Sequence, residues 1–163
     1  MGKRLVPFVA IACGSLGWAL SAAPPASAQA VSSADVNIVS VAGAKTPKAF
    51  TCTAVINNQN DDDSYQTTVI VLLPLQTRDI LRMSVVGGPG HCQKGLLHGG
   101  FRQYATCSLG QLPQGPTVRR TVTITSTNST AAANYPQTCS AFVYSAVGDI
   151  DKKNNYMAAA PVP

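Results

Sequence analysis

Apolar and polar positions alternate along most of the chain, which is the period-two pattern of strands half-buried in a sheet. In segment 48–56 the apolar side chains of Phe50, Cys52, Ala54 and Ile56 share one face. Segment 67–73 is instead a continuous β-branched run stopped by Pro74, which is typical of a strand covered on both sides. The pattern predicts strands over 35–41 (with a one-residue slip after Ile38), 48–56, 67–73, 80–86, 101–109, 118–125, 139–145 and 156–160.

No window of the 163 residues has the apolar spacing of an amphipathic helix of useful length, and the chain contains no Glu. Turn-forming residues separate the predicted strands at intervals of roughly 8–12 residues, as in two-sheet proteins. The length suits one ordinary domain. We therefore expect an all-β sandwich of seven to nine antiparallel strands.

The first residues have the three parts of a secretory signal. Lys3 and Arg4 precede an apolar run from Leu5 to Leu20, and Ala26-Ser27-Ala28 forms a small-residue cleavage site. A membrane anchor is a weaker interpretation because Pro7 and two glycines interrupt the run. We expect a cleaved signal over 1–28 (with cleavage after Ala30 as second choice), a short lead over 29–34, and one domain over 35–160 in a secreted or periplasmic protein without stable membrane insertion.

Four cysteines follow the predicted signal: Cys52, Cys92, Cys107 and Cys139. In an oxidising compartment an even number indicates two disulfides, for which three connectivities exist. A metal site is a weaker interpretation, because no Cys-x-x-Cys pair is present and His91 and His98 are the only histidines.

Four motifs occur in the order found in a known family. They are Val55-Ile-Asn-Asn58, Leu72-Leu-Pro74, Cys107-Ser-Leu-Gly-Gln-Leu-Pro-Gln-Gly115 followed by Thr121-Val-Thr-Ile-Thr125, and Asp149-Ile-Asp-Lys-Lys-Asn-Asn155. Through them, residues 35–160 resemble the Ig-like repeats of bacterial surface proteins, namely the cell-adhesion-related bacterial domain and its relative "domain of unknown function eleven". Family members usually occur in tandem, whereas this sequence contains one such repeat; Cys52 and Cys139 are a second departure from the family.

The resemblance implies a disulfide pairing. In an Ig-like sandwich the second and penultimate strands lie in opposite sheets, so it pairs Cys52 with Cys139, while Cys92 and Cys107 flank a Gly-rich bend and close a local hairpin. Loop-closure entropy gives these two bonds roughly 4 and 3 kcal/mol respectively. Both are large against a total stability on the order of 5–15 kcal/mol.

Candidate catalytic groups are sparse. The two histidines share one Gly-rich segment, no nucleophile elbow is present, and the acids cluster in predicted loops. The basic excess is +5, or 10 − 7 = +3 without the signal, and lacks the dense basic stripe of nucleic-acid-binding proteins. We therefore expect a protein that is not an enzyme, requires no cofactor and does not bind nucleic acid; its oligomeric state stays open.

Two loops rich in carboxylates and amides are expected at the same end of such a sandwich. Their oxygens could converge on Ca²⁺, which takes 6–8 oxygen ligands, although Asp and Asn also favour turns without any metal. The hypothetical calcium ligands are Asp61, Asp62, Asp63, Asp149, Asp151 and Asn155, with Asn154 beside them.

The resemblance implies a non-enzymatic domain in binding, adhesion or cell-surface structure, with a protein or a cell-surface glycan as partner. An alternative is a small secreted inhibitor or effector that docks through the stapled hairpin between Cys92 and Cys107. A third hypothesis, a fimbrial subunit completed by a donated strand, requires a missing last strand. The hairpin contacts would be Leu96, Leu97, His98 and Phe101, and Tyr135, Tyr144 and Tyr156 are further candidates for exposed contacts or for packing at the edge of the core.

Overall fold

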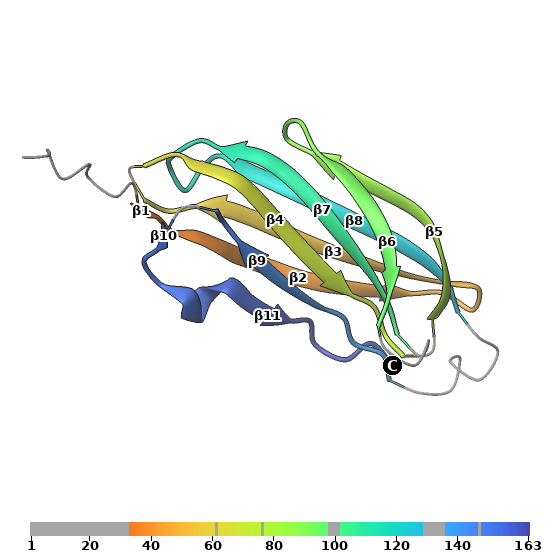
Figure 1. The fold of residues 1–163 in the computed structure, drawn as a ribbon. Helices are drawn as coiled ribbons and strands as arrows, with labels where there is room; N and C mark the ends of the chain where they lie inside the picture. The colour runs from red at the N-terminus through yellow and green to blue at the C-terminus, as the bar shows by residue number, and fades with distance from the viewer. Residues whose placement is uncertain (1–32, 61, 76, 98–101, 129–135, 147) are drawn as a thin grey trace, which may run out of the picture. The chain divides into compact units, whose positions relative to one another are not determined.

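The computed structural model describes residues 33–60, 62–75, 77–97, 102–128, 136–146 and 148–163, so the predicted signal lies outside the described residues. The elements, shown in Figure 1, are β1 (Ser33–Ala34), β2 (Val36–Lys45), β3 (Ala49–Asn58), β4 (Ser64–Leu72), β5 (Thr77–Val86), β6 (His91–Leu96), β7 (Gln103–Leu112), β8 (Arg119–Asn128), β9 (Ser140–Tyr144), β10 (Gly148–Asp149), the 3-10 helix η2 (Lys152–Asn155) and β11 (Tyr156–Ala158).

Two antiparallel sheets form the predicted sandwich. One has the strand order β2-β3-β8-β5 and the other β11-β9-β4-β7-β6, while the short strands β1 and β10 pair in parallel. In chain order, β2, β3, β4, β5, β8, β9 and β11 occupy the places of the seven strands of an immunoglobulin constant-type domain. The hairpin β6–β7 is an addition that extends the second sheet beyond β4.

The core lies between the sheets because inward positions alternate with outward ones along each strand. In β3, Phe50, Cys52, Ala54 and Ile56 are buried as predicted. The slip predicted after Ile38 is a β-bulge, where the register of β2 against β3 shifts between Ile38 and Ser40. Other core side chains are Val36, Val69, Val71, Leu73, Leu109, Leu112, Val122, Ile124, Ala141 and Val143.

The predicted disulfide pairing is confirmed. Cys52 on β3 is joined to Cys139, which directly precedes β9, so this bond links the two sheets; the Cα atoms are 6.2 Å apart and both residues are buried. Cys92 on β6 is joined to Cys107 on β7, its direct neighbour in the same sheet, with Cα atoms 4.0 Å apart. The first bond occupies the inter-sheet position of the disulfide in antibody domains.

Two features of the strands differ from the prediction. β6 was not predicted, because His91–Leu96 has no alternation of apolar residues; its pairing with β7 and the disulfide hold it in the sheet. β4 was predicted to be covered on both sides, but its buried residues Thr67, Val69 and Val71 alternate with outward residues. Of these, Ile70 and Leu72 are half-buried.

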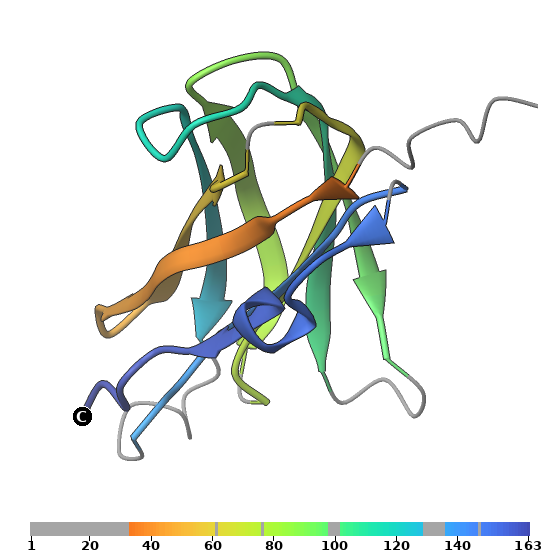
Figure 2. The same cartoon turned by 90° about the vertical axis from the view of Figure 1, so that its left-hand side faces the viewer.

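The sheets approach each other closely along one side. β2 packs against β9, β11 and η2, and both views show the blue β9–β11 segment beside the orange β2 (Figures 1 and 2). The last predicted strand is present as β11, since Tyr156–Ala158 pairs with β9. Within the described ranges, the structure has no helical segment of the length and apolar character needed to span a bilayer.

Candidate functional site

The aromatic residues gather on one sheet rather than in the core. Of the six aromatic residues in the described part of the chain, Phe50 is fully buried. The other five lie on strands of the five-stranded sheet, and four of these are exposed by 42–50% of their surface. Aromatic side chains usually dominate cores and interfaces, so a group of them on the surface marks an interaction site. The five are Tyr65, Tyr104, Phe142, Tyr144 and Tyr156.

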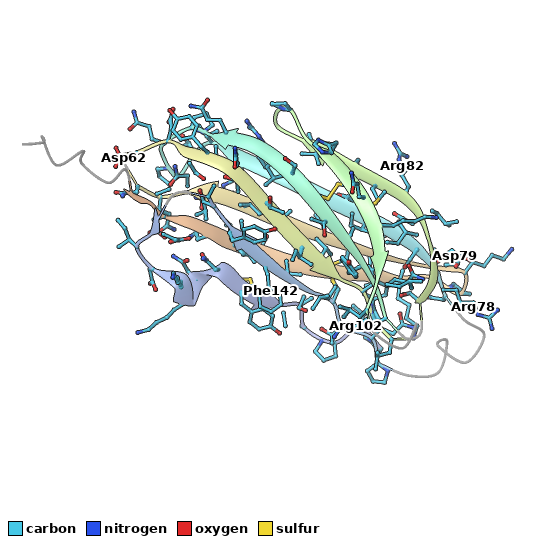
Figure 3. The ribbon with its side chains drawn as sticks, viewed as in Figure 1. Asp62, Arg78, Asp79, Arg82, Arg102 and Phe142 are labelled. Atoms are coloured by element: carbon cyan, nitrogen blue, oxygen red, sulfur yellow. A yellow bond between two sulfur atoms is a disulfide. The ribbon has the colours of Figure 1, made fainter. Side chains whose placement is uncertain are left out.

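Strand alternation places most of these rings on the outer face of the sheet. On β9, Ala141 and Val143 enter the core, so Phe142 and Tyr144 point outward. Tyr156 on β11 is paired in register with Phe142, and their ring centroids are 4.5 Å apart with planes inclined by 38°. Figure 3 shows Phe142 on the β9–β11 part of this sheet.

The rings continue across the sheet through aliphatic side chains. Ile70 on β4 is paired in register with Phe142, and Leu72 on the same strand is paired with Tyr104 on β7. Tyr104 extends over Gly95 of β6, where a Cβ atom would overlap its ring. We call this surface the outer strip; its members are Ile70, Leu72, Tyr104, Phe142, Tyr144 and Tyr156.

Hydroxyl groups border the outer strip, and charged groups do not enter it. Thr68 is paired in register with Tyr144, while Thr106 and Ser108 lie on the same face of β7. No Asp, Lys or Arg occupies an outward position of β4, β7 or β9 among the described residues. The strip is therefore an uncharged aromatic surface with hydroxyl neighbours.

A cavity of about 480 Å³ adjoins the outer strip at the end of β9. Tyr144 belongs to both, and the remaining wall comes from the residues that follow β9. The lining residues are Tyr144, Ser145, Ala146, Gly148, Asp149, Lys152 and Asn155.

Asp149 is the acidic group of this cavity. Burial raises the pKa of its carboxyl above the ordinary value, the nearby carboxylates of Asp35 and Asp151 add to that rise, and hydrogen bonds from Asn155 and the Asp151 backbone oppose it. Asn155 Nδ2 donates to Asp149 Oδ2 at 2.8 Å, and the Asp151 N–H donates to Asp149 Oδ1 at 3.2 Å. These bonds fix the carboxyl at the cavity wall.

The hypothetical calcium ligands only partly come together. Asp63 accepts hydrogen bonds from Gln111 and from the Gln114 N–H, so it faces the β7–β8 connection, while Asp149 and Asp151 accept bonds from their own loop. Asp35 joins the two loops, since its backbone oxygen accepts from the Gln59 N–H at 2.8 Å and its carboxylate accepts from Asn154 Nδ2 at 2.8 Å.

Among the described residues, no group of three or more His, Cys, Asp or Glu side chains is placed to hold a metal ion. Asp61 lies outside those residues, so calcium binding stays a prediction. A melting temperature that is the same with calcium and with a chelator would contradict it.

The predicted hairpin contacts are also only partly described. Leu96 and Leu97 are exposed by 58% and 42%, beside a cavity of about 270 Å³ that Ile80, Lys94 and Leu96 help to line. His98 and Phe101 lie outside the described residues, as does Tyr135.

Sequence reasoning named Tyr144 and Tyr156 but missed the outer strip as a surface. Two features of the sequence could have revealed this surface. Ile70 and Leu72 lie in the apolar run that was assigned to a strand covered on both sides, and Phe142 alternates with the core residues of β9.

No family model matches this chain, and no curated protein matches it either. Among solved structures it is similar to AvmM, described as catalysing macrocyclization in alchivemycin A biosynthesis (14% identity over 76% of this chain and 86% of that one, TM-score 0.42). It is also similar to a biomass-sensing module of an Rsgi-like protein of Clostridium thermocellum (10% identity over 71% of this chain and 97% of that one, TM-score 0.41). A third similar structure is a cohesin module of a Clostridium perfringens family 33 glycoside hydrolase (13% identity over 80% of this chain and 93% of that one, TM-score 0.40). These scores are too low to carry a functional inference.

Proposed function

We propose that this protein is a non-enzymatic binding domain of an oxidising compartment, secreted or periplasmic, and that it attaches to a saccharide through the outer strip. The observation that carries the proposal is the placement of five of six described aromatic residues on the five-stranded sheet. The two disulfides support the assignment to an oxidising compartment, since such bonds persist where thiols are not kept reduced.

The chemistry of the outer strip favours a saccharide over an apolar protein surface. One face of a sugar ring presents C–H bonds, which are weakly positive and suit the negative face of an aromatic ring. The edges of the sugar carry hydroxyls, which suit the threonine and serine hydroxyls that border the strip. Protein interfaces are enriched in Arg as well as in aromatic residues, and Arg is absent from the outward positions of β4, β7 and β9 in the described ranges.

The test is retention of the oxidised protein on insoluble cellulose, chitin and purified peptidoglycan. We expect wild type to bind at least one of them, and Phe142→Ala/Tyr156→Ala to weaken that binding by roughly tenfold or more. The matched control is Thr53→Ala/Thr123→Ala, a pair in register on the outer face of the opposite sheet. Equal retention of all three proteins, or wild type binding to none of the materials, would contradict the proposal.

A second candidate function is docking of the β6–β7 hairpin onto a protein target, as an inhibitor or effector. It is favoured by the exposure of Leu96 and Leu97 on a disulfide-closed hairpin, which loses little entropy on binding. A photo-crosslinking residue at position 96 or at position 142 separates the two functions on intact cells. A protein adduct formed from position 96 and not from position 142 would support the second candidate.

A further inference from the structure

The cavity beside Tyr144 stands where the outer strip stops. Tyr144 is the last residue of β9, and the chain then forms the far wall through β10 and η2. Its volume of about 480 Å³ exceeds the volumes of about 270, 260 and 210 Å³ of three other depressions in the described part of the chain. It also lies within the range of roughly 300–1,000 Å³ typical of small-molecule sites. A saccharide chain that followed β9 along the strip would therefore reach this wall with its last sugar.

The wall is held in place by hydrogen bonds within its own segment and by contacts with β1, β2 and β9. The Asp151 carboxylate accepts from the Lys153 N–H at 2.9 Å at the start of η2, and the Ile150 N–H donates to the Ala34 oxygen at 3.1 Å. β10 pairs with β1, and η2 packs against β2 and β9. A binding group on such a wall loses little conformational entropy when a ligand arrives.

The polar groups of the wall have the donors and acceptors that a pair of sugar hydroxyls needs. The Asp149 carboxylate offers acceptors, and the Lys152 ammonium offers donors and makes no ion pair within the described residues. One negative and one positive group leave the cavity without net charge, which suits a neutral sugar better than a uronic acid or a sugar with a free amino group. The Ser145 hydroxyl is already engaged, since it donates to the Tyr65 backbone oxygen and accepts from the Ser64 hydroxyl.

We propose that this cavity is a terminal subsite, which holds the end sugar of a neutral saccharide while the following sugars stack on Tyr144, Phe142 and Tyr156. This inference rests on the proposed function and deepens it, because it assigns recognition of a chain end rather than of an internal stretch. Tyr144 is the link, since its ring both lines the cavity and belongs to the outer strip.

The first experiment measures binding of soluble cellotetraose and chitotetraose to the oxidised protein by calorimetry. We expect one of them to bind wild type, Asp149→Asn/Lys152→Ala to bind it roughly tenfold or more weakly, and the control Asp79→Asn/Lys48→Ala to match wild type within about twofold. The control makes the same two chemical changes at exposed positions outside the cavity lining. Should the double variant unfold, Lys152→Ala alone carries the test, because Lys152 is exposed.

The outcomes separate the subsite from the proposed function. If Phe142→Ala/Tyr156→Ala loses the tetrasaccharide while Asp149→Asn/Lys152→Ala keeps it within about twofold, the terminal subsite is wrong and the saccharide-binding function stands. If wild type binds neither tetrasaccharide nor any insoluble polysaccharide, both fail.

A second experiment tests recognition of the chain end directly. The tetrasaccharide that binds is coupled to beads through its reducing end or through its non-reducing end. We expect wild type to be retained by one coupling and not by the other, because the end sugar must enter the cavity. Equal retention by both couplings would overturn the terminal subsite.

Discussion

The two sheets are joined differently at the β2 and β11 side of the sandwich, which we call the closed side, and at the β5 and β6 side, which we call the open side. On the first side, β2 packs against β9, β11 and η2, and the buried Cys52–Cys139 bond joins the two sheets through β3 and the start of β9. On the second side, two edge strands face each other across a cavity of about 270 Å³, and Cys92–Cys107 joins neighbours within a single sheet. The aromatic pair Phe142–Tyr156 lies on the closed side, where β11 pairs with β9.

The open side is protected against pairing with other chains. The register of β5 against β8 shifts twice, between Thr77 and Ile80 and between Ile80 and Arg82, and such bulges twist an edge away from a partner strand. Figure 3 shows Arg78, Asp79 and Arg82 along β5, and charged side chains on an edge discourage pairing further. The two sides therefore differ: bulges and charges at the β5 edge discourage pairing with other chains, while the aromatic surface proposed to bind a saccharide lies on the closed side.

The largest expected effect comes from the bond on the closed side. Cys52→Ala/Cys139→Ala opens a loop with a sequence separation of 87, so we expect the free energy of unfolding to fall by roughly 4 kcal/mol. A guanidinium titration followed by circular dichroism measures it. A loss of less than about 1 kcal/mol would show that packing of β2 against β9 and β11 closes this side without the bond.

The bond on the open side is expected to contribute less. Cys92→Ala/Cys107→Ala opens a separation of 15, so we expect a loss of at most about 3 kcal/mol in the same titration. Cys92 is half-buried, and we expect the backbone pairing of β6 with β7 to persist without the bond. A loss larger than that of the Cys52 and Cys139 variant would reverse the comparison of the two sides.

A buried amide links the end of β3 to the residue before β2, to the β3–β4 connection and to the end of β7. Asn58 Oδ1 accepts from the Asp35 N–H at 3.2 Å, and Nδ2 donates to the backbone oxygens of Asp62 at 2.6 Å and Leu112 at 3.3 Å. Asn58→Ala leaves these groups without their partner, so we expect a loss of about 2 kcal/mol in the free energy of unfolding. The control Asn128→Ala, which removes one exposed bond to the Thr46 oxygen, is expected to cost less; an equal cost would contradict a special role for Asn58.

The smallest expected effect is a pH dependence at Asp149. Because burial raises the pKa of this carboxyl in the fold, the native state holds the proton more tightly than the unfolded chain does. Its contribution to stability is therefore fully present below the unfolded pKa and is lost as the pH rises through the raised native pKa. Asp149→Asn has no proton to lose, so its stability relative to wild type should increase with pH across that window and then stay constant.

Chemical denaturation of both proteins at several values between about pH 3 and about pH 7 measures this difference. A relative stability of the variant that decreases with pH would contradict the raised pKa and the arrangement of the wall around it.

The fold could be predicted well from the sequence because most strands carry their own alternation. The core residues of β3 alternate with outward residues within one segment, so this strand could be predicted from the local sequence alone. These core residues are Phe50, Cys52, Ala54 and Ile56. β6 could not be predicted, since His91–Leu96 is held by β7 and by a disulfide rather than by its own pattern. The pairing of Cys52 with Cys139 followed from the resemblance, because the places of the second and penultimate strands in the fold decide which cysteines can meet.

By itself the sequence determined which residues of each strand share a face, because side chains alternate with a period of two. It therefore already placed Phe142 and Tyr144 together. Only the tertiary structure decided that Tyr156 stands against Phe142, that Ile70 continues the same surface, and that Asp149 forms the wall at its end. Those contacts join residues far apart in the chain, and the order of strands in the sheet, which no local pattern encodes, brings them together.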